Sequence, residues 1–142
     1  MWFRPVISVA RGTPLADAIR LMQDQKIGAL LVTDGTRIAG ILTERDVLMK
    51  VAGRNLDLRT TQIDELMTRD PETLRMEHPI AVALNKMSVG GFRRIALVDR
   101  EGAPVGIVTI RDIMDYIIGL FPAAVLNMPP DPECVAETRD NG

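Results

Sequence analysis

The 142-residue sequence has one cysteine, Cys134, and one histidine, His78. A single cysteine excludes a disulfide within the chain, and a single histidine falls short of the ligand set of a structural zinc site. His78 precedes Pro79 at a predicted helix start, where we expect a helix-entry residue and not a catalytic base. A phosphate-binding P-loop of the form G-x-x-x-x-G-K-[ST] is also missing. The sequence therefore predicts no catalytic residue, no metal ligand and no enzyme.

The sequence also lacks a strong charge of either sign and a long apolar run. Its formal net charge is −2, which gives no general attraction to nucleic acid or to an anionic membrane. The longest apolar run near the C-terminus, residues 117–121, is far shorter than the roughly 20 residues of a membrane-spanning helix. The first residues, MWFRPV, do not resemble a signal peptide. We therefore expect a cytoplasmic protein that binds neither nucleic acid nor a membrane.

What the sequence does contain is an internal repeat. The residues GILTERD, which begin at Gly40, return as GIVTIRD at Gly106, and 106 − 40 gives an offset of 66. Residues 8–22 match residues 73–87 at an offset of 65. A match that extends along whole units of this length indicates two copies of one structural unit.

Each copy predicts the same order of elements: strand, helix, strand, strand and helix. Thr13 and Pro14 predict a helix start, with the hydroxyl as cap and the proline at the first helical position. Short apolar runs bounded by turn residues predict the paired strands, GALLVT with RIAGIL and RRIALVD with PVGIV. We therefore expect an α/β (α+β) fold made of two βαββα units.

The repeat also predicts the boundaries along the chain. The first unit spans 1–56 with a core of about 6–54, the linker 57–63, the second unit 64–121 and the tail 122–142. The linker region carries one predicted helical turn around residues 63–67. The tail includes PPDPECVAETRDNG, which is polar and rich in proline, so we expect it to be disordered, with an inert Cys134.

The two T-x-x-D motifs allow a structural and a functional interpretation. As capping boxes, Thr43 and Thr109 would cap helices while Asp46 and Asp112 reach back to the backbone. As ligand groups, each threonine at a helix start suits a phosphate or ribose oxygen, and each aspartate can accept two hydrogen bonds from a ribose diol. The glycines before the motifs fit a close backbone approach. Two such motifs, one in each unit, predict two related clefts around a pseudo-two-fold axis.

These motifs, together with TPLADAIRLM and IDELMTRDPETL, make the chain similar to tandem CBS domains, the repeat named after cystathionine β-synthase, which pair into a Bateman module. The resemblance covers about residues 6–121. It implies that AMP, ADP, ATP or S-adenosylmethionine binds in clefts between the repeats, with no further cofactor. It also implies a regulatory sensor that acts through a partner protein. A ligand-independent dimerisation or scaffolding module is the alternative.

The resemblance further implies site residues by position. Ribose contacts would fall to Asp46 and Asp112, and phosphate or ribose contacts to Thr43 and Thr109. The base would contact residues 7–9, 29–31, 72–74 and 95–97, with Ser8, Ala29, Thr73 and Ile95 as candidates.

Arg93 and Arg94, which enter a strand of the second unit, would meet phosphate. The aligned residues of the first unit, Ile27 and Gly28, carry no charge. We therefore expect a phosphate-rich ligand to prefer the cleft that the two arginines line.

The helices after the two motifs carry more apolar residues than one small sheet needs. They are Val47, Leu48, Val51, Ile113, Met114, Ile117, Ile118, Leu120 and Phe121. A monomer would expose part of this set to water. The pattern predicts an isologous homodimer, helix against helix, and the resemblance implies the flat disc that Bateman modules usually form.

Overall fold

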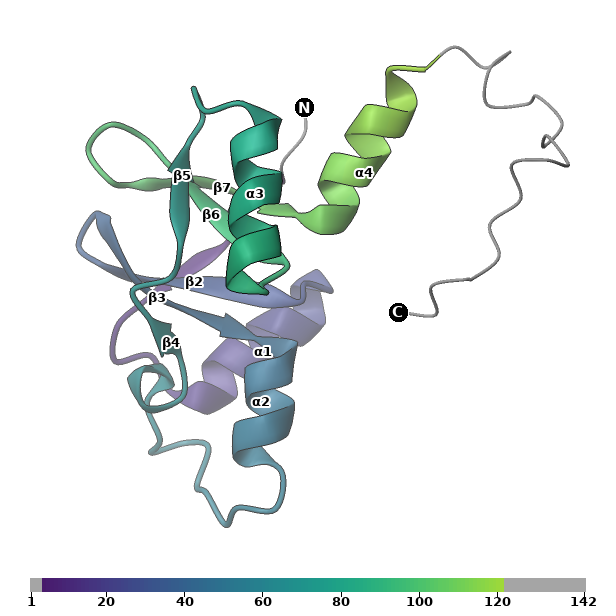
Figure 1. Ribbon diagram of the computed structural model, residues 1–142. Coiled ribbons are helices and arrows are strands. Elements are labelled where there is room, and N and C mark those ends of the chain that lie inside the picture. Colours follow the sequence, from purple (N-terminus) through teal and green to yellow (C-terminus); the bar gives the residue numbers. More distant parts are fainter. Residues whose placement is uncertain (1–3, 122–142) are drawn as a thin grey trace, which may run out of the picture.

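The computed structural model describes residues 4–121, and its elements follow the predicted order twice (Figure 1). The first repeat consists of β1 (Ser8–Ala10), α1 (Leu15–Gln25), β2 (Ala29–Asp34), β3 (Arg37–Thr43) and α2 (Glu44–Val51). Residues 57–70, which are called the linker from here on and extend beyond the predicted 57–63, contribute the 3₁₀ helix η1 (Ile63–Glu65) and β4 (Thr68–Arg69). The second repeat consists of β5 (Thr73–Arg75), α3 (Ile80–Gly90), β6 (Arg94–Val98), β7 (Pro104–Thr109) and α4 (Ile110–Gly119). The predicted tail, with Cys134, lies outside the described residues.

Each repeat has its own small mixed sheet. The strand order is β1-β2-β3-β4 in the first sheet and β5-β6-β7 in the second. In both, the first strand runs parallel to the second after a helical crossover, and the second pairs antiparallel with the third through a short turn. This shared topology confirms the two βαββα units that the repeated sequence predicts.

The linker adds a fourth strand to the first sheet. β4 pairs antiparallel with β3 and places Arg69 opposite Gly40 and Thr68 opposite Ile41. An atom at the Cβ position of Gly40 would lie 2.5 Å from Met67 Sδ and 2.8 Å from the carbonyl oxygen of Thr68. The close backbone approach predicted at this glycine is therefore made by the linker.

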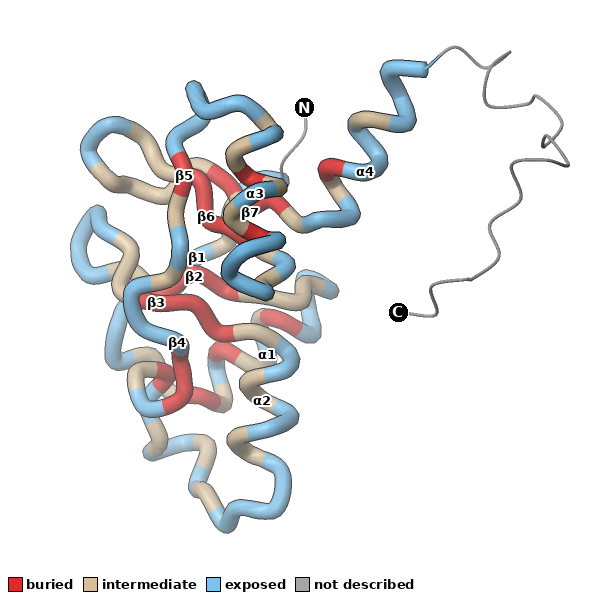
Figure 2. The backbone as a smooth tube through the Cα atoms, in the orientation of Figure 1, coloured by how far each residue is buried: buried red, intermediate tan, exposed pale blue. Residues whose placement is uncertain are grey.

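Three apolar clusters hold the elements together, one in each repeat and one that joins them (Figure 2). The first cluster includes Ile63 and Leu66 of the linker, which close one end of the first core. The joining cluster consists of Leu31, Ile41 and Ala96, from strands of both sheets. Because a buried aliphatic side chain contributes about 1.5–3 kcal/mol, this cluster fixes the two repeats against each other and with them the clefts between the sheets.

The second helix of each repeat begins with the capping box that the motif predicts. The hydroxyls of Thr43 and Thr109 each accept a hydrogen bond from the backbone N–H three residues later. The start of α1 differs, because Thr13 Oγ1 donates to the carbonyl of Ala10 and Pro14 precedes the first helical residue. The hydroxyl cap predicted at Thr13 is therefore wrong, since the hydroxyl closes the preceding turn instead.

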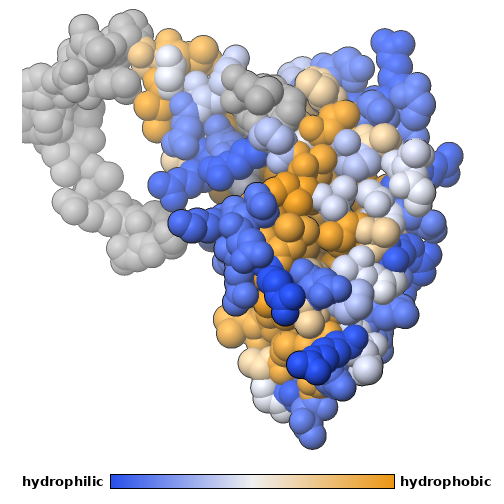
Figure 3. Space-filling model, turned by 180° about the vertical axis from the view of Figure 1, so that it is seen from behind, coloured by the Kyte–Doolittle hydropathy of each residue, from blue (hydrophilic) through white to orange (hydrophobic). Residues whose placement is uncertain are grey.

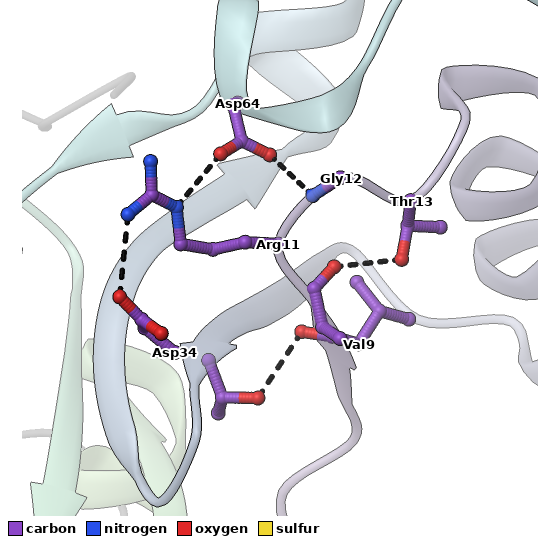
Figure 4. Close-up of polar contacts among 8 residues, drawn as sticks. Val9, Arg11, Gly12, Thr13, Asp34 and Asp64 are labelled. Atoms are coloured by element: carbon purple, nitrogen blue, oxygen red, sulfur yellow. Dashed lines mark hydrogen bonds and ion pairs between the residues drawn. The ribbon is translucent and has the colours of Figure 1, made fainter.

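Charged hydrogen bonds anchor the linker to the first repeat (Figure 4). Asp64, in η1, accepts from the backbone N–H of Gly12 at 2.7 Å and from Arg11 Nε at 2.8 Å. These donors, the Gly12 N–H foremost, hold the pKa of Asp64 below its ordinary value. Arg11 also pairs with Asp34 at 3.3 Å. The turn after β1, the end of β2 and η1 thus meet at one point.

The residues predicted to form a dimer interface divide into a core face and an exposed face. Ile113 is fully buried, and Val47, Val51 and Ile117 pack against the two repeat cores. The exposed residues, called the apolar stripe below, are Leu48, Met114, Ile118, Leu120 and Phe121. Apolar surface also forms a band through the middle of the side opposite to the view of Figure 1 (Figure 3).

Candidate functional site

A cavity of about 430 Å³, the first cleft, lies between the repeats. Its lining consists of Ile41, Thr43, Arg45, Asp46, Thr68, Asp70, Pro71, Glu72, Gly91, Phe92, Arg93, Arg94 and Ala96. Both repeats and the linker contribute. The cavity thus brings together four predicted site residues, Thr43 and Asp46 from the first repeat with Arg93 and Arg94 from the second.

The capping box fixes the carboxylate of Asp46 at the start of α2. Its Oδ2 accepts from the backbone N–H and from the hydroxyl of Thr43, both at 3.0 Å. Its Oδ1 pairs with Lys50 Nζ at 3.2 Å, one turn further along the helix. Since a carboxylate oxygen can accept more than one hydrogen bond, Asp46 still has acceptor capacity for a ligand. The structural and the functional interpretation of the motif are therefore compatible.

The charged residues of the first cleft leave cationic groups available. Its arginines are Arg45, Arg93 and Arg94, and its acids are Asp46, Asp70 and Glu72. Lysines already pair with Asp46 and Glu72. Within residues 4–121 neither Asp70 nor any of the three arginines takes part in an ion pair, which leaves three guanidinium groups against one carboxylate. Guanidinium groups form strong, charge-assisted hydrogen bonds with phosphate. This part of the cleft suits an anionic ligand.

The rest of the lining offers apolar surface. Ile41 and Ala96, which also belong to the cluster that joins the two repeats, line the cavity together with Phe92. Aromatic and aliphatic side chains pack favourably against the flat face of a base. Acceptor oxygens, arginines and an apolar wall in one cavity form the combination that a nucleotide requires.

Arg94 lies between the two repeats and lines both the first cleft and a second, smaller one. Its aligned residue in the first repeat is Gly28. An atom at the Cβ position of Gly28 would lie 2.7 Å from Arg94 Nη2 and 3.2 Å from Glu44 Oε1. The glycine of one repeat thus makes room for the arginine of the other.

The second cleft has a volume of about 120 Å³. Its lining consists of Arg4, Pro5, Val6, Ile7, Lys26, Ile27, Gly28, Ala29, Leu31, Arg94, Ile107 and Thr109. The predicted residues Ala29 and Thr109 are present, but Asp112 is missing from the lining. Asp112 accepts from the backbone N–H of Thr109 at 3.1 Å and pairs with Arg4 Nε at 2.9 Å. The pseudo-symmetric clefts are therefore unequal.

Ser8, Thr73 and Ile95 line neither cleft, although their chain neighbours do. Those neighbours are Ile7, Glu72 and Ala96. Successive side chains of a strand point to opposite faces, and the side chain of Ile95 lies fully buried in the core of the second repeat. The predicted strands lie at the clefts, but the residues chosen there are one position away from the lining.

The sequence pattern did not single out Arg4, Asp70 or Phe92, which line the clefts. Asp70 has a left-handed backbone conformation, φ 48°, between β4 and β5. Arg4 precedes β1 and exchanges two backbone hydrogen bonds with Ile107 of β7, at 2.9 and 3.0 Å. An alignment of the repeats extended to the N-terminus, which puts Arg4 against Arg69 at the offset of 65, is the one signal that points to this segment.

The described part of the chain forms neither a metal-binding cluster nor a membrane-spanning helix. Between residues 4 and 121, no three His, Cys, Asp or Glu side chains gather as a metal ion would require. None of the helices described there has the length and apolar character of a membrane span.

The fold defines a module made of two paired βαββα repeats with clefts between them. The chain belongs to the CBS domain family, whose sequence pattern matches residues 3–53 and 63–119. Both matches fall on the two structural repeats, which confirms the predicted family and its Bateman architecture.

Similarity to individual proteins extends over most of the chain. A CBS domain-containing protein of Arabidopsis thaliana, CBSCBSPB3, is 31% identical over 115 residues, which are 81% of this chain and 21% of that protein. This chain therefore spans about a fifth of the length of that relative.

Two solved structures of CBS proteins with ligands share the fold. CBS domain protein PAE2072 from Pyrobaculum aerophilum, complexed with AMP, has a TM-score of 0.70 and 27% identity, with 87% of this chain and 89% of that chain covered. The CBS domain pair of protein MJ0100, in complex with 5′-methylthioadenosine and S-adenosyl-L-methionine, has a TM-score of 0.71 and 26% identity, with 82% and 90% covered.

Proposed function

We propose that this chain is a non-catalytic regulatory module that binds an adenosine nucleotide in its first cleft. The observation that carries the proposal is the cavity of about 430 Å³ in which Thr43 and Asp46 meet Arg93 and Arg94. The adenosine compounds that PAE2072 and MJ0100 bind support this ligand class.

Each group of the first cleft has a distinct role in the proposal. Asp46 accepts hydrogen bonds from the ribose hydroxyls, and Thr43 contacts ribose or phosphate. Arg93 and Arg94 bind the phosphate, while Phe92 contributes apolar surface for the adenine. Because three guanidinium groups outnumber the one carboxylate of the cleft without an ion pair, Asp70, AMP, ADP or ATP is favoured over S-adenosylmethionine, which has no phosphate.

The position of the cleft explains how binding is communicated. Its lining comes from both repeats and the linker, so we expect a bound ligand to alter how the repeats pack around their shared cluster of Leu31, Ile41 and Ala96. Binding that differs between two arrangements of the repeats shifts the equilibrium toward one of them. We expect a partner protein to respond to that shift, and a second copy of the chain to pack on the apolar stripe.

The alternative function is a dimerisation or scaffolding module that needs no ligand. In that case Thr43 and Asp46 serve only as the capping box of α2. The capping box is compatible with both functions, because Asp46 keeps acceptor capacity for a ligand while it caps α2.

Thermal melting and titration calorimetry with AMP, ATP and S-adenosylmethionine separate the two functions. A ligand at roughly 100 times its Kd adds about 2.7 kcal/mol of stability, so a binder melts at a higher temperature. Asp46→Ala is expected to abolish this rise while it lowers the stability of the free protein by only about 1 kcal/mol. Asp17→Ala, at an exposed aspartate in the first turn of α1, is the control and should bind like the parent. A parent that none of the three compounds stabilises would favour the scaffold.

A further inference from the structure

We infer that Arg4 restricts the chain to one adenosine ligand by pairing with Asp112, the counterpart of Asp46 in the second repeat. This inference rests on the proposed function of the first cleft. It explains why two clefts built from the same T-x-x-D motif differ in volume, about 430 Å³ against about 120 Å³.

The segment around Arg4 is held on β7 by its backbone. The N–H and the carbonyl of Arg4 both pair with Ile107. From this position Arg4 Nε reaches Asp112 Oδ1 at 2.9 Å, while Asp112 Oδ2 accepts the N–H of Thr109. The side chain of Asp112 is only 10% exposed. Asp46 and Asp112 each have both carboxylate oxygens engaged, but Asp46 lines the first cleft, whereas Asp112 is absent from the lining of the second and pairs with a residue, Arg4, that is part of it.

In the first cleft, a short side chain occupies the position that corresponds to Arg4. Thr68 lies opposite Ile41, the residue that aligns with Ile107 at the offset of 66. Thr68 is therefore the structural counterpart of Arg4, and a threonine at this position is too short to reach Asp46. Asp46 instead pairs with Lys50 of its own helix and lines its cleft.

The register of the strand pairing places an arginine at the second cleft and a threonine at the first. By sequence offset Arg4 aligns with Arg69, but Arg69 lies opposite Gly40, the residue before Ile41. A shift of one residue moves a side chain to the other face of a sheet. Arg4 consequently lies on the cleft side, where the linker of the first repeat presents Thr68.

Exchange of the two counterparts tests the inference, with AMP as the probe and titration calorimetry as the measurement. The parent is expected to bind one AMP per chain. Arg4→Thr should release Asp112 and raise the stoichiometry to two, because Arg94 and Lys26 remain in the lining of the second cleft. Thr68→Arg should close the first cleft and weaken AMP binding at least tenfold. Arg37→Thr, at an exposed arginine in β3, is the control and should leave one site.

Two aspartate variants provide a second measurement if Thr68→Arg fails to fold. Asp46→Ala should abolish AMP binding, whereas Asp112→Ala, which removes the same kind of cap, should leave both affinity and stoichiometry unchanged. Two comparable sites in the parent, or loss of affinity in Arg4→Thr, would overturn the inference and leave the proposed function standing. If neither the parent nor Arg4→Thr binds AMP, the proposed function fails as well.

Discussion

The guanidinium of Arg94 lies against the backbone of Gly28, its aligned residue in the other repeat: a Cβ atom at Gly28 would be 2.7 Å from Arg94 Nη2. Only one repeat can carry the long basic side chain at this place, because its partner must be small. Arg94 in one repeat and Gly28 in the other are thus complementary in size. It places one half-buried arginine where both clefts can use it.

Gly28→Ala should weaken nucleotide binding without unfolding the protein. The methyl group would displace the end of a flexible arginine side chain, which costs the fold little, but it would move the guanidinium away from its place in the first cleft. We expect AMP affinity in titration calorimetry to fall several-fold, with a melting temperature close to that of the parent. Gly119→Ala, at a helical glycine with no neighbouring atom within 4 Å of its Cβ position, is the control. An unchanged AMP affinity in Gly28→Ala would remove Arg94 from the proposed phosphate site.

Local spacing made part of the site predictable. Thr43 and Asp46 are three residues apart, so their capping box follows from the sequence alone, as does its copy in the second repeat. The start of α1 was not predictable in this way. Thr13 has the residue type of a cap, but the carbonyl of Ala10 competes for its hydroxyl.

Contacts between distant residues were not predictable. Arg4 and Asp112 are separated by 108 positions, and their ion pair depends on which residue of β7 lies opposite Arg4. For the same reason the sequence did not show that Ala96, and not its neighbour Ile95, lines the first cleft. Hydrophobic runs locate a strand, but in short apolar strands the pattern does not say which face meets the cleft.

Asp64 should make stability depend on pH in the acidic range. Its pKa in the folded protein is held below the ordinary value of 3.8, first by the N–H of Gly12 and then by Arg11. A carboxyl with a lowered folded pKa stabilises the protein fully above its unfolded pKa, and this contribution is lost as the pH falls through the folded pKa. Urea unfolding between about pH 7 and pH 3 should therefore show a decline at the acidic end.

Asp64→Asn isolates this contribution. The variant should be less stable than the parent at pH 7 by about 1–2 kcal/mol, and the difference between the two should shrink toward pH 3. Asp24→Asn, at an exposed aspartate of α1, is the control and should follow the parent. A constant difference between Asp64→Asn and the parent at every pH would contradict the assignment.

Gly40→Ala should loosen the linker from the first sheet. The new methyl group would meet the side chain of Met67 and, at 2.8 Å, the backbone oxygen of Thr68, which cannot rotate away. Overpacking of this kind costs about 1–3 kcal/mol of unfolding free energy. Urea unfolding measures the loss, and amide hydrogen exchange should show weaker protection in β4. A free energy of unfolding within about 0.5 kcal/mol of the parent would mean that β4 separates from β3 at little cost.

The apolar stripe should mediate a homodimer. The side chains of Ile118 and Phe121 are 47% and 51% exposed, and a second copy of the chain would bury this apolar surface. Ile118→Asp should therefore convert a dimer into a monomer in sedimentation velocity at micromolar concentration, with AMP binding retained. Ile117→Asp would be a poor test, because Ile117 packs against the core of the second repeat. The control is Val89→Asp, at an 82% exposed valine of α3 outside the stripe, which should leave the dimer intact. A parent that sediments as a single chain would exclude this interface.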